Sequence, residues 1–305
     1  MAGHYSVEPA APQSVDGAIC LLLGLNPRTD SRSARADIFR DWMNRQGVRP
    51  IYQALWRRKP IAAATVLANP GKTGLLVHTP CWLCQTRKAA LIQAIRIASQ
   101  SAIESHLAFV QTLISPQDSP TCNLLERAGY QRLTELVYMR LDLDVELPPA
   151  TVRLDWHTAE ELPQSVLEQT IAATYVDSLD CPALAGLREL DDVVEGHRSS
   201  GVYTPHSWHV AFVGGVPVGC ALVNDVISAN RADIVYLGVA RAARGKGIGR
   251  ALLQRAAESA QRGGKGALTL AVDVTNAPAM KLYESYGFER TDRRLAMVFL
   301  PKSVL

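Results

Sequence analysis

Apolar residues in the second half of the chain recur with the periods of helices and strands. Positions 248, 251, 252, 256 and 260 form the apolar stripe of a helix that ends at Gly263-Gly264. Runs rich in Val, Ile and Leu predict strands, and Gly214-Gly215 predicts a tight hairpin between the first two. The predicted strands are residues 208–212, 216–223, 234–239, 267–272 and 295–300; the other predicted helices are one that contains Leu162, Val166 and Ile171, residues 187–198, and Pro278 to Gly287.

The order of these elements predicts a mixed α/β sheet (an α+β arrangement), antiparallel at first and parallel around the long helix. A length of 305 residues fits two domains. Pro148-Pro149 cannot lie within a regular element, so we expect one domain in residues 1–146 and a second in residues 150–305. In the first domain, residues 18–25 are expected to form a buried strand, and residues 52–67 and 74–78 the early strands of the sheet.

The two halves of the chain resemble each other at a constant spacing. Residues 276–288 (NAPAMKLYESYGF) correspond to residues 118–130 (DSPTCNLLERAGY). A repeat on this scale indicates two copies of one fold. The aligned pairs are Pro278 and Pro120, Glu284 and Glu126, and Gly287 and Gly129.

Composition argues against several classes of protein. A net charge of +3, with acids and bases mixed, gives no basic stripe for nucleic acid. No signal peptide is visible, and the apolar run at 18–25 is too short to cross a bilayer. Six cysteines in a chain of this length do not make a disulfide framework, so we expect a cytoplasmic protein with reduced thiols. Cys81 and Cys84 form a lone CxxC without further zinc ligands, so no metal is expected; a redox site is the alternative to two structural thiols.

The strongest signal for chemistry lies in residues 234–250 (IVYLGVARAARGKGIGR), where a buried strand ends in a glycine loop and a helix starts at once. Gly245, Gly247 and Gly249 let backbone N–H groups approach a ligand closely, and the positive helix end suits a diphosphate. Three cations flank the loop: Arg244, Lys246 and Arg250.

A dinucleotide-binding fold would use the same physics. Asp273 ends the next strand, where a ribose-binding acid would lie. The glycine spacing is not GxGxxG, however, and the hairpin upstream does not fit that fold. A dinucleotide binder therefore stays an alternative.

The loop and the helix after it resemble the GNAT superfamily of N-acetyltransferases. The loop matches the pattern [QR]-x-x-G-x-[GA] at Arg244, Gly247 and Gly249. The helix matches N-x-x-A-x-x-L-Y-x-x-x-G-F at each fixed position, which are Asn276, Ala279, Leu282, Tyr283, Gly287 and Phe288. The resemblance covers about residues 150–305 and, with the repeat, implies two tandem GNAT-like domains in an arrangement similar to that of mycothiol synthase.

This resemblance implies direct transfer of an acetyl group from acetyl-CoA to a primary amine. Backbone groups of Leu237, Gly238 and Val239 would hold the pantetheine and polarise the thioester carbonyl. Tyr283 matches the general acid for the departing thiolate, and a core aromatic is its alternative interpretation. The remaining residues expected at the cofactor are Arg244, Gly245, Lys246, Gly247, Ile248, Gly249, Arg250 and Asn276, of which Asn276 is also a candidate helix cap and Arg244 a candidate surface residue.

The groups that would receive the amine are less firmly indicated. Asp233 is the acid nearest the position of the glutamate base in many relatives; being shorter, it would act through a water, and a solvated strand end is the alternative. Asp177 and Asp180 lie where the family's first helices form the acceptor wall and would attract an ammonium group, unless they are ordinary loop acids. His209 is a further candidate for the cleft, with a structural histidine as its alternative.

The first copy lacks the features that carry chemistry in the second. Its aligned loop, residues 83–89 (LCQTRKA), has no glycine, Leu125 stands in place of Tyr283, and Asp118 replaces Asn276. We therefore expect a degenerate, non-catalytic domain that contacts the second one and shapes substrate binding, with a remnant ligand pocket as the alternative.

The leading hypothesis is thus an amine N-acetyltransferase with one active site. A catalytically silent acyl-CoA-binding or sensor protein is the second hypothesis, and a nucleotide binder the third. The expected partner is a small-molecule or peptide amine, without nucleic acid or membrane. Its identity and the oligomeric state are not indicated by the sequence, because acceptor walls are built from variable loops.

Overall fold

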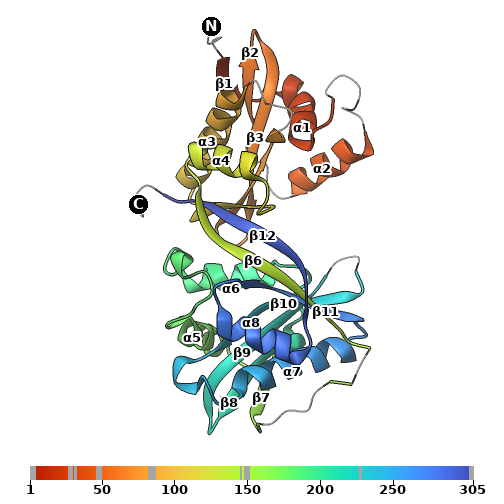
Figure 1. The fold of residues 1–305 in the computed structure, drawn as a ribbon, viewed down its shortest axis with the longest axis vertical. Helices are drawn as coiled ribbons and strands as arrows, with labels where there is room; N and C mark the ends of the chain where they lie inside the picture. The colour runs from red at the N-terminus through yellow and green to blue at the C-terminus, as the bar shows by residue number, and fades with distance from the viewer. Residues whose placement is uncertain are drawn as a thin grey trace. The chain divides into compact units, whose positions relative to one another are not determined.

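The computed structural model describes residues 5–26, 30, 33–45, 50–81, 87–144, 146–147, 152–226 and 229–301, with only the backbone of residues 44 and 45. The chain forms two compact units (Figure 1). The first unit consists of Met1–Leu133 and Leu295–Leu305, and the second of Thr134–Arg294. Each unit has a sheet with helices on both faces, which confirms the predicted mixed α/β fold.

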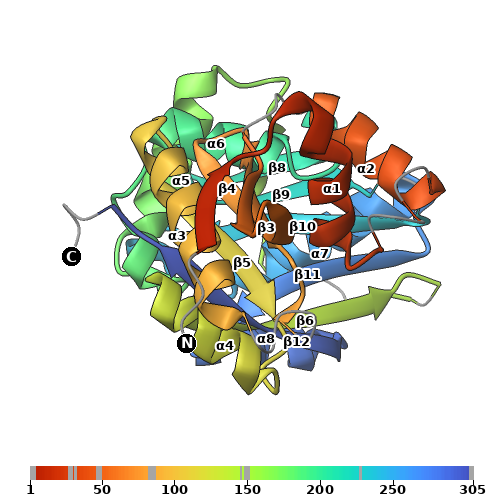
Figure 2. The ribbon, with the colours of Figure 1, turned by 90° about the horizontal axis from the view of Figure 1, so that it is seen from above.

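The sheet of the first unit has a period-two division of its side chains. On β3, Ala62, Ala64 and Val66 pack in the cluster that contains α3, whereas Ala63 and Leu67 pack against α1. Figure 2 shows α1 and α3 on opposite sides of β3. The strands, in sheet order, are β1 (Tyr5–Pro9), β2 (Tyr52–Trp56), β3 (Lys59–Asn69), β4 (Thr73–His78), β5 (Phe109–Ile114) and the end of β12 (Glu289–Phe299). The helices are α1 (Val15–Leu23), α2 (Ala34–Arg45), α3 (Lys88–Glu104) and α4 (Ser119–Ala128).

The prediction of a strand at residues 18–25 is wrong, because these residues belong largely to α1. Ala18, Ile19 and Leu22 are buried on one side of this helix, in the cluster that includes β3. Gly24 ends the helix with a φ of 70°. A short apolar run fits a buried strand and a buried helix equally well, so its periodicity did not separate them.

The second unit repeats this plan with a different set of strands. On β9, Cys220 and Leu222 pack in the cluster of α5 and α6, whereas Ala221 and Val223 pack in the cluster of α7. The strands, in sheet order, are β6 (Gln131–Asp142), β11 (Ala267–Asp273), β10 (Arg231–Val239), β9 (Val216–Asp225), β8 (Trp208–Val213) and β7 (Asp155–Thr158). The helices are α5 (Gln164–Tyr175), α6 (Leu190–Arg198), α7 (Ile248–Arg262) and α8 (Ala277–Tyr286). Strand β7 was not predicted, and β12 starts six residues before the predicted strand at 295–300.

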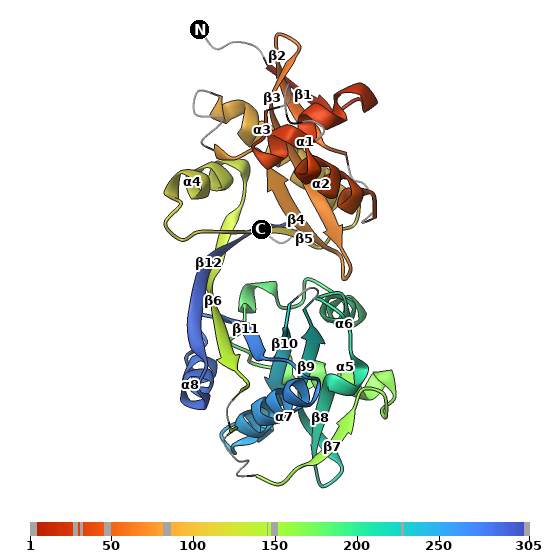
Figure 3. The same cartoon turned by 90° about the vertical axis from the view of Figure 1, so that its right-hand side faces the viewer.

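The last strand of each half of the sequence lies in the sheet of the other half. β6 follows α4 but pairs along β11 from Leu136 to Asp142. β12 follows α8, yet its residues Leu295 to Phe299 pair with β5. Figures 1 and 3 show β6 and β12 running side by side. The compact units therefore do not follow the predicted boundary between residues 146 and 150, of which residues 148–151 lie outside the described part of the chain.

The local geometry of the two halves confirms the internal repeat. Asp118 caps α4 with φ −81° and ψ 66°, and Asn276 caps α8 with φ −79° and ψ 68°. Gly129 and Gly287 end these helices with φ 102° and 108°. Equivalent ion pairs follow, between Glu126 and Arg132 and between Glu284 and Arg290. The same backbone path therefore occurs twice.

The strand exchange predicts how fragments of the chain behave. A fragment of residues 150–305 lacks β6, which leaves the edge of β11 open and removes the buried Val137 and Met139 from the core. We expect this fragment to aggregate or to unfold without a sharp transition, whereas residues 134–294 fold. Thermal unfolding of both fragments, followed by circular dichroism, checks this. Cooperative unfolding of fragment 150–305 at the same melting temperature as fragment 134–294 would contradict it.

Candidate functional site

The two central strands of the second unit pair only along their first halves. The parallel register of β10 and β11 ends at Ile234 and Leu270, although both strands continue. A bulge between Ile234 and Tyr236 interrupts the pairing of β10 with β9 at the same level. Beyond this point, the backbone groups of β10 that face β11 have no partner in that strand.

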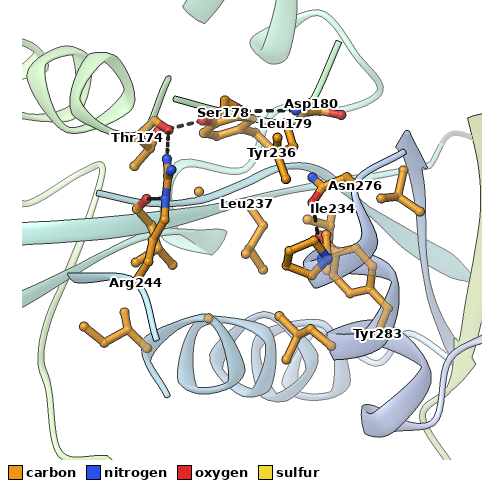
Figure 4. A pocket seen from close by; sticks show the side chains of 18 of the residues that line it. Thr174, Ser178, Leu179, Asp180, Ile234, Tyr236, Leu237, Arg244, Asn276 and Tyr283 are labelled. Atoms are coloured by element: carbon orange, nitrogen blue, oxygen red, sulfur yellow. Dashed lines mark hydrogen bonds between the residues drawn. The ribbon is translucent and has the colours of Figure 1, made fainter. Parts of the chain in front are cut away.

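A cavity of about 450 Å³ lies at the gap between these two strands. It is lined by both strands, the loop before α7, the start of α8 and the segment after α5 (Figure 4). The predicted site residues that line it are Asp177, Asp180, Leu237, Gly238, Val239, Arg244, Gly245, Gly247, Ile248, Gly249, Asn276 and Tyr283. Lys246, Arg250, Asp233 and His209 are the predicted residues that are not part of its lining.

The glycine loop presents backbone N–H groups toward this cavity. Gly245 and Gly247 have φ of 76° and 78°, a left-handed conformation that side chains disfavour. Gly247 caps α7 without a side-chain hydrogen bond. No described residue accepts a hydrogen bond from the N–H groups of residues 245–249. These free donors and the positive end of α7 form an anion-binding turn.

Gly238 allows α5 to pack closely on β10. A Cβ atom at this position would lie 2.7 Å from Thr174 Oγ1 and 2.7 Å from Tyr236 Oη. Those two hydroxyl groups are hydrogen-bonded to each other at 2.6 Å. A larger residue at 238 would therefore displace the end of α5 from the cavity.

The Arg244 side chain is committed to carbonyl groups of the protein. Its Nε donates to Val239 O at 3.0 Å, and its two terminal nitrogens donate to the carbonyls of Thr174, Val176 and Asp177 at 2.8–2.9 Å. Four of the five guanidinium N–H groups are thereby used. The sequence assigned this charge to a diphosphate, whereas the structure places it on the segment after α5.

Lys246 and Arg250, unlike Arg244, are not part of the lining. Lys246 Nζ donates to Ala242 O at 3.0 Å. The Arg250 guanidinium lies 5.3 Å from the ring centre of Tyr286. In this structure, both side chains therefore contact other parts of the protein.

Tyr283 is 7% exposed and its ring packs 5.8 Å from that of Phe288. Burial, and next the negative charge of Asp180, raise the pKa of this phenol, so it stays protonated at neutral pH. Asn276 Oδ1 accepts from Ala279 N at 3.3 Å, so this residue caps α8 and also lines the cavity. Figure 4 shows Tyr283 and Asn276 on one side of the cavity, with Arg244 and Thr174 on the other.

The predicted carboxylates fall into two groups: Asp233 lies outside the lining of the cavity, whereas Asp177 and Asp180 belong to it. Asp233 lies where β10 and β11 are still paired, and its carboxylate accepts a hydrogen bond from Thr269 Oγ1. The structure does not bring it to the cavity. Asp177 lines the cavity and forms an ion pair with Arg241. Asp180 also lines the cavity. Desolvation, followed by the charge of Asp273, raises the pKa of its carboxyl group.

Asp273 is 1% exposed and serves the protein itself. Its carboxylate accepts from Thr134 Oγ1 at 2.6 Å, from the N–H and hydroxyl of Thr275 at 2.8 and 2.7 Å, and from Cys181 N at 3.2 Å. Burial alone would raise its pKa, but these hydrogen bonds lower it below the usual value. A carboxylate held in this way is not free for a ribose, which argues against the dinucleotide alternative.

His209 is a buried histidine of β8 that does not line the cavity. It is 2% exposed and packs 6.5 Å from the Trp156 ring. Neither ring nitrogen has a hydrogen-bond partner among the described residues. Burial, and then the charge of Arg255, lower its pKa to about 4, so the ring is neutral at pH 7. The arrangement is that of a structural histidine.

Sequence reasoning missed part of the lining. Tyr236 interrupts an otherwise aliphatic strand, which was a visible signal for a special position. The others carried no pattern of their own and come from the end of α5, the loop after it and the start of α8. The missed residues include Thr174, Ser178, Leu179, Tyr236 and Pro278.

The first unit also has parted parallel strands, but it has a leucine at the position of Tyr283. The parallel register of β4 and β5 ends at Leu75 and Gln111. Leu125, the counterpart of Tyr283, is 0% exposed and packs in the core with Leu76 and Ile114. The counterpart of the glycine loop falls largely on residues 82–86, outside the described part of the chain, and this includes Cys84.

Two further searches concern metals and membranes. In the described ranges, no group of three His, Cys, Asp or Glu side chains is placed to hold a metal ion. None of the helices in those ranges combines the length and hydropathy needed to span a bilayer.

Comparison with known proteins agrees with this geometry. Residues 174–288 match the Acetyltransferase (GNAT) family. Mycothiol acetyltransferase of Acidothermus cellulolyticus is 30% identical over 178 residues, 54% of this chain and 54% of the relative. Streptothricin acetyltransferase of Streptomyces lavendulae is 43% identical over 70 residues, 23% of this chain and 37% of the relative. The matched segments thus span about half or less of these curated relatives.

Solved structures extend the likeness to both units. A GCN5-related N-acetyltransferase from Sphaerobacter thermophilus aligns with a TM-score of 0.64 and 19% identity over 97% of this chain and 96% of that one. A tandem GNAT protein from the clavulanic acid biosynthesis pathway aligns with a TM-score of 0.54 and 15% identity over 97% and 98%. Residues 174–288 are therefore similar to a GNAT domain, and the chain has the fold of tandem GNAT proteins.

Proposed function

We propose that the chain is an acetyl-CoA-dependent N-acetyltransferase with one active site, located at the parted strands of the second unit. The observation that carries this proposal is that free N–H donors, unpaired strand backbone and a protonated phenol line one cavity. The curated relatives named as acetyltransferases, and the use of acetyl-CoA by the GNAT family, support the same activity.

The cavity residues fit acetyl-CoA, which would supply an activated acetyl thioester. The N–H groups of residues 245–249 would hold its diphosphate at the start of α7. Leu237, Gly238 and Val239 would bind the pantetheine through the backbone groups that β11 leaves unpaired. A backbone N–H in the same stretch would stabilise the negative charge on the thioester oxygen. Asn276 lines the cavity beside them.

Transfer requires the acceptor amine to lose a proton and the departing thiolate to gain one. The amine nitrogen would bond to the carbonyl carbon as the carbon–sulfur bond breaks. Asp180 would take the proton from the ammonium group, and its raised pKa makes it a stronger base than an ordinary carboxylate. Tyr283 would give its phenolic proton to the sulfur. Asp180 thus takes the role that the sequence analysis assigned to Asp233.

We further propose that residues 1–146 form a degenerate, non-catalytic copy. The buried Leu125 offers no proton where Tyr283 stands in the second copy. The acceptor would be a primary amine on a small molecule or a peptide, drawn by the carboxylates of Asp177 and Asp180 at the cavity.

Calorimetry and turnover test the function together. Titration with acetyl-CoA is expected to give one site per chain, since the aligned loop of the first copy, residues 83–89, has no glycine. Release of free thiol is then followed with streptothricin, glucosamine, spermidine and a peptide with a free N-terminus. Two sites would contradict a degenerate first copy, and tight binding without turnover of any amine would indicate a sensor protein instead.

Tyr283→Phe removes the proposed proton donor and keeps the ring. We expect kcat to fall about 100-fold, the lower range for a lost general acid, with acetyl-CoA affinity changed less than about twofold. Tyr286→Phe is the matched control, because this neighbouring tyrosine does not line the cavity. An unchanged kcat of Tyr283→Phe would remove the phenol from the mechanism.

Asp180→Asn and Asp233→Asn separate the two candidate bases. The raised pKa of Asp180 means that its active carboxylate is lost as pH falls through that value, so wild-type activity decreases on the acid side. We expect Asp180→Asn to lower kcat/KM about 100-fold and to abolish this acid limb.

The pH dependence of stability at Asp180 has the opposite sign to that of activity. Because burial raises the pKa, its contribution to stability is present at low pH and lost as pH rises through the folded-state pKa, so the melting midpoint of Asp180→Asn at pH 7 is not expected to fall. Asp233→Asn is expected to keep the acid limb of the pH profile. A loss of that limb in Asp233→Asn alone would return the base role to Asp233.

A further inference from the structure

We propose that residues 176–181 form a strap over the cavity, and that Arg244 and Asp273 are positioning residues that hold its two ends. The strap is defined by these six residues. Only the kinetic part of this inference rests on the proposed function; the anchoring itself is a property of the folded chain.

Arg244 holds the first end of the strap. The carbonyls of Thr174, Val176 and Asp177, where α5 ends, receive three of the four hydrogen bonds that the guanidinium donates within the protein. Carbonyl groups at a helix C-terminus lack intrahelical partners and carry partial negative charge, so a planar cation suits them. The fourth bond, to Val239 O, ties the same guanidinium to the end of β10.

Asp273 holds the second end. Cys181 N donates to Asp273 Oδ2 at 3.2 Å, while the other carboxylate oxygen, Oδ1, is held by Thr134 and Thr275. The hydrogen bonds to Oδ1 thereby fix the orientation of the carboxylate, so that Oδ2 is directed at Cys181 N. Its lowered pKa keeps it ionised, and an ionised acceptor makes the stronger hydrogen bond.

The strap has some local support, since Ser178 N donates to Tyr175 O at 3.0 Å and Asp180 N donates to Ser178 Oγ at 3.1 Å, but its backbone is strained at two residues. Asp177 and Cys181 have φ of 52° and 45°, a left-handed conformation that costs energy for residues other than glycine. Val176 and Leu179 are 51% and 50% exposed, so core packing does not fix their side chains. Between the two ends lie four cavity-lining residues, including Asp180.

The anchors stand on the two strands that part. Arg244 follows the end of β10 and is bonded to it, and Asp273 is the last residue of β11. The strap therefore spans the gap in which the cofactor would lie. Binding of the cofactor in that gap and the position of Asp180 are therefore coupled through the same two side chains. The backbone of Arg244 belongs to the cofactor loop, whereas its side chain holds the segment that carries Asp180.

Two variants test the anchors one at a time. Arg244→Lys keeps the positive charge but cannot make four directed hydrogen bonds. Asp273→Asn leaves Oδ1 for Thr134 and Thr275, but turns an NH₂ group toward Cys181 N. Arg294→Lys is the matched control, since Arg294 pairs with Asp292 on the surface of β12.

Hydrogen exchange of the amides in residues 176–181 is the primary measurement, made on the full chain without ligand. We expect either anchor variant to exchange there about 10-fold faster, the effect of losing the closing hydrogen bonds, with the amides of α7 unchanged. The control variant is expected to match the wild type. Unchanged exchange of the strap in both anchor variants would overturn the proposal.

Acetyl-CoA binding and kinetics give the second readout. In both variants we expect acetyl-CoA affinity within about twofold of the wild type, and a KM about 10-fold higher for each panel amine that the wild type acetylates. A 10-fold loss of acetyl-CoA affinity in Arg244→Lys, with the strap still protected, would instead place the guanidinium on the diphosphate and overturn the inference. If the wild type acetylates none of the amines, the proposed function fails while the exchange experiment still decides the anchors.

Discussion

Backbone hydrogen bonds between β10 and β11 stop after Ile234 and Leu270, and the organisation of the site follows from that interruption. Paired strands satisfy each other's backbone groups, whereas parted strands must leave theirs to a ligand or to water. The gap therefore supplies directed donors and acceptors along an extended molecule without any special side chain. The glycine loop continues this row of donors into the start of α7.

Side chains around the gap mostly support the backbone. Arg244 joins the loop to the end of α5, Asp273 receives the other end of the same segment, and the Thr174–Tyr236 hydrogen bond closes the space between helix and strand. Gly238 permits that close approach. A charged side chain within a binding motif is thus not always directed at the ligand, since a guanidinium surrounded by carbonyls forms its hydrogen bonds inside the protein.

The two copies share a fold but differ in residues that the proposed chemistry uses. Both have parted parallel strands, equivalent helix caps and equivalent ion pairs. The difference lies in side chains: a phenol lines the cavity in one copy, and Leu125 fills the core in the other. Exchange of β6 and β12 also links the copies, because each sheet is completed by a strand from the other half of the sequence.

The sequence by itself determined the features that depend on local chemistry: the long helix, the glycine loop, the cap at Asn276, the mixed sheet and the repeat. Each arises from residues close together in the chain, where periodicity and backbone preference act directly. Tertiary structure alone decided the rest. It made residues 18–23 part of a helix, placed Asp233 in the paired part of the sheet, turned Arg244 toward carbonyls, and put β6 and β12 each in the sheet of the other half. These outcomes depend on which strands pair and which loops meet across long separations, and no local pattern records such pairings.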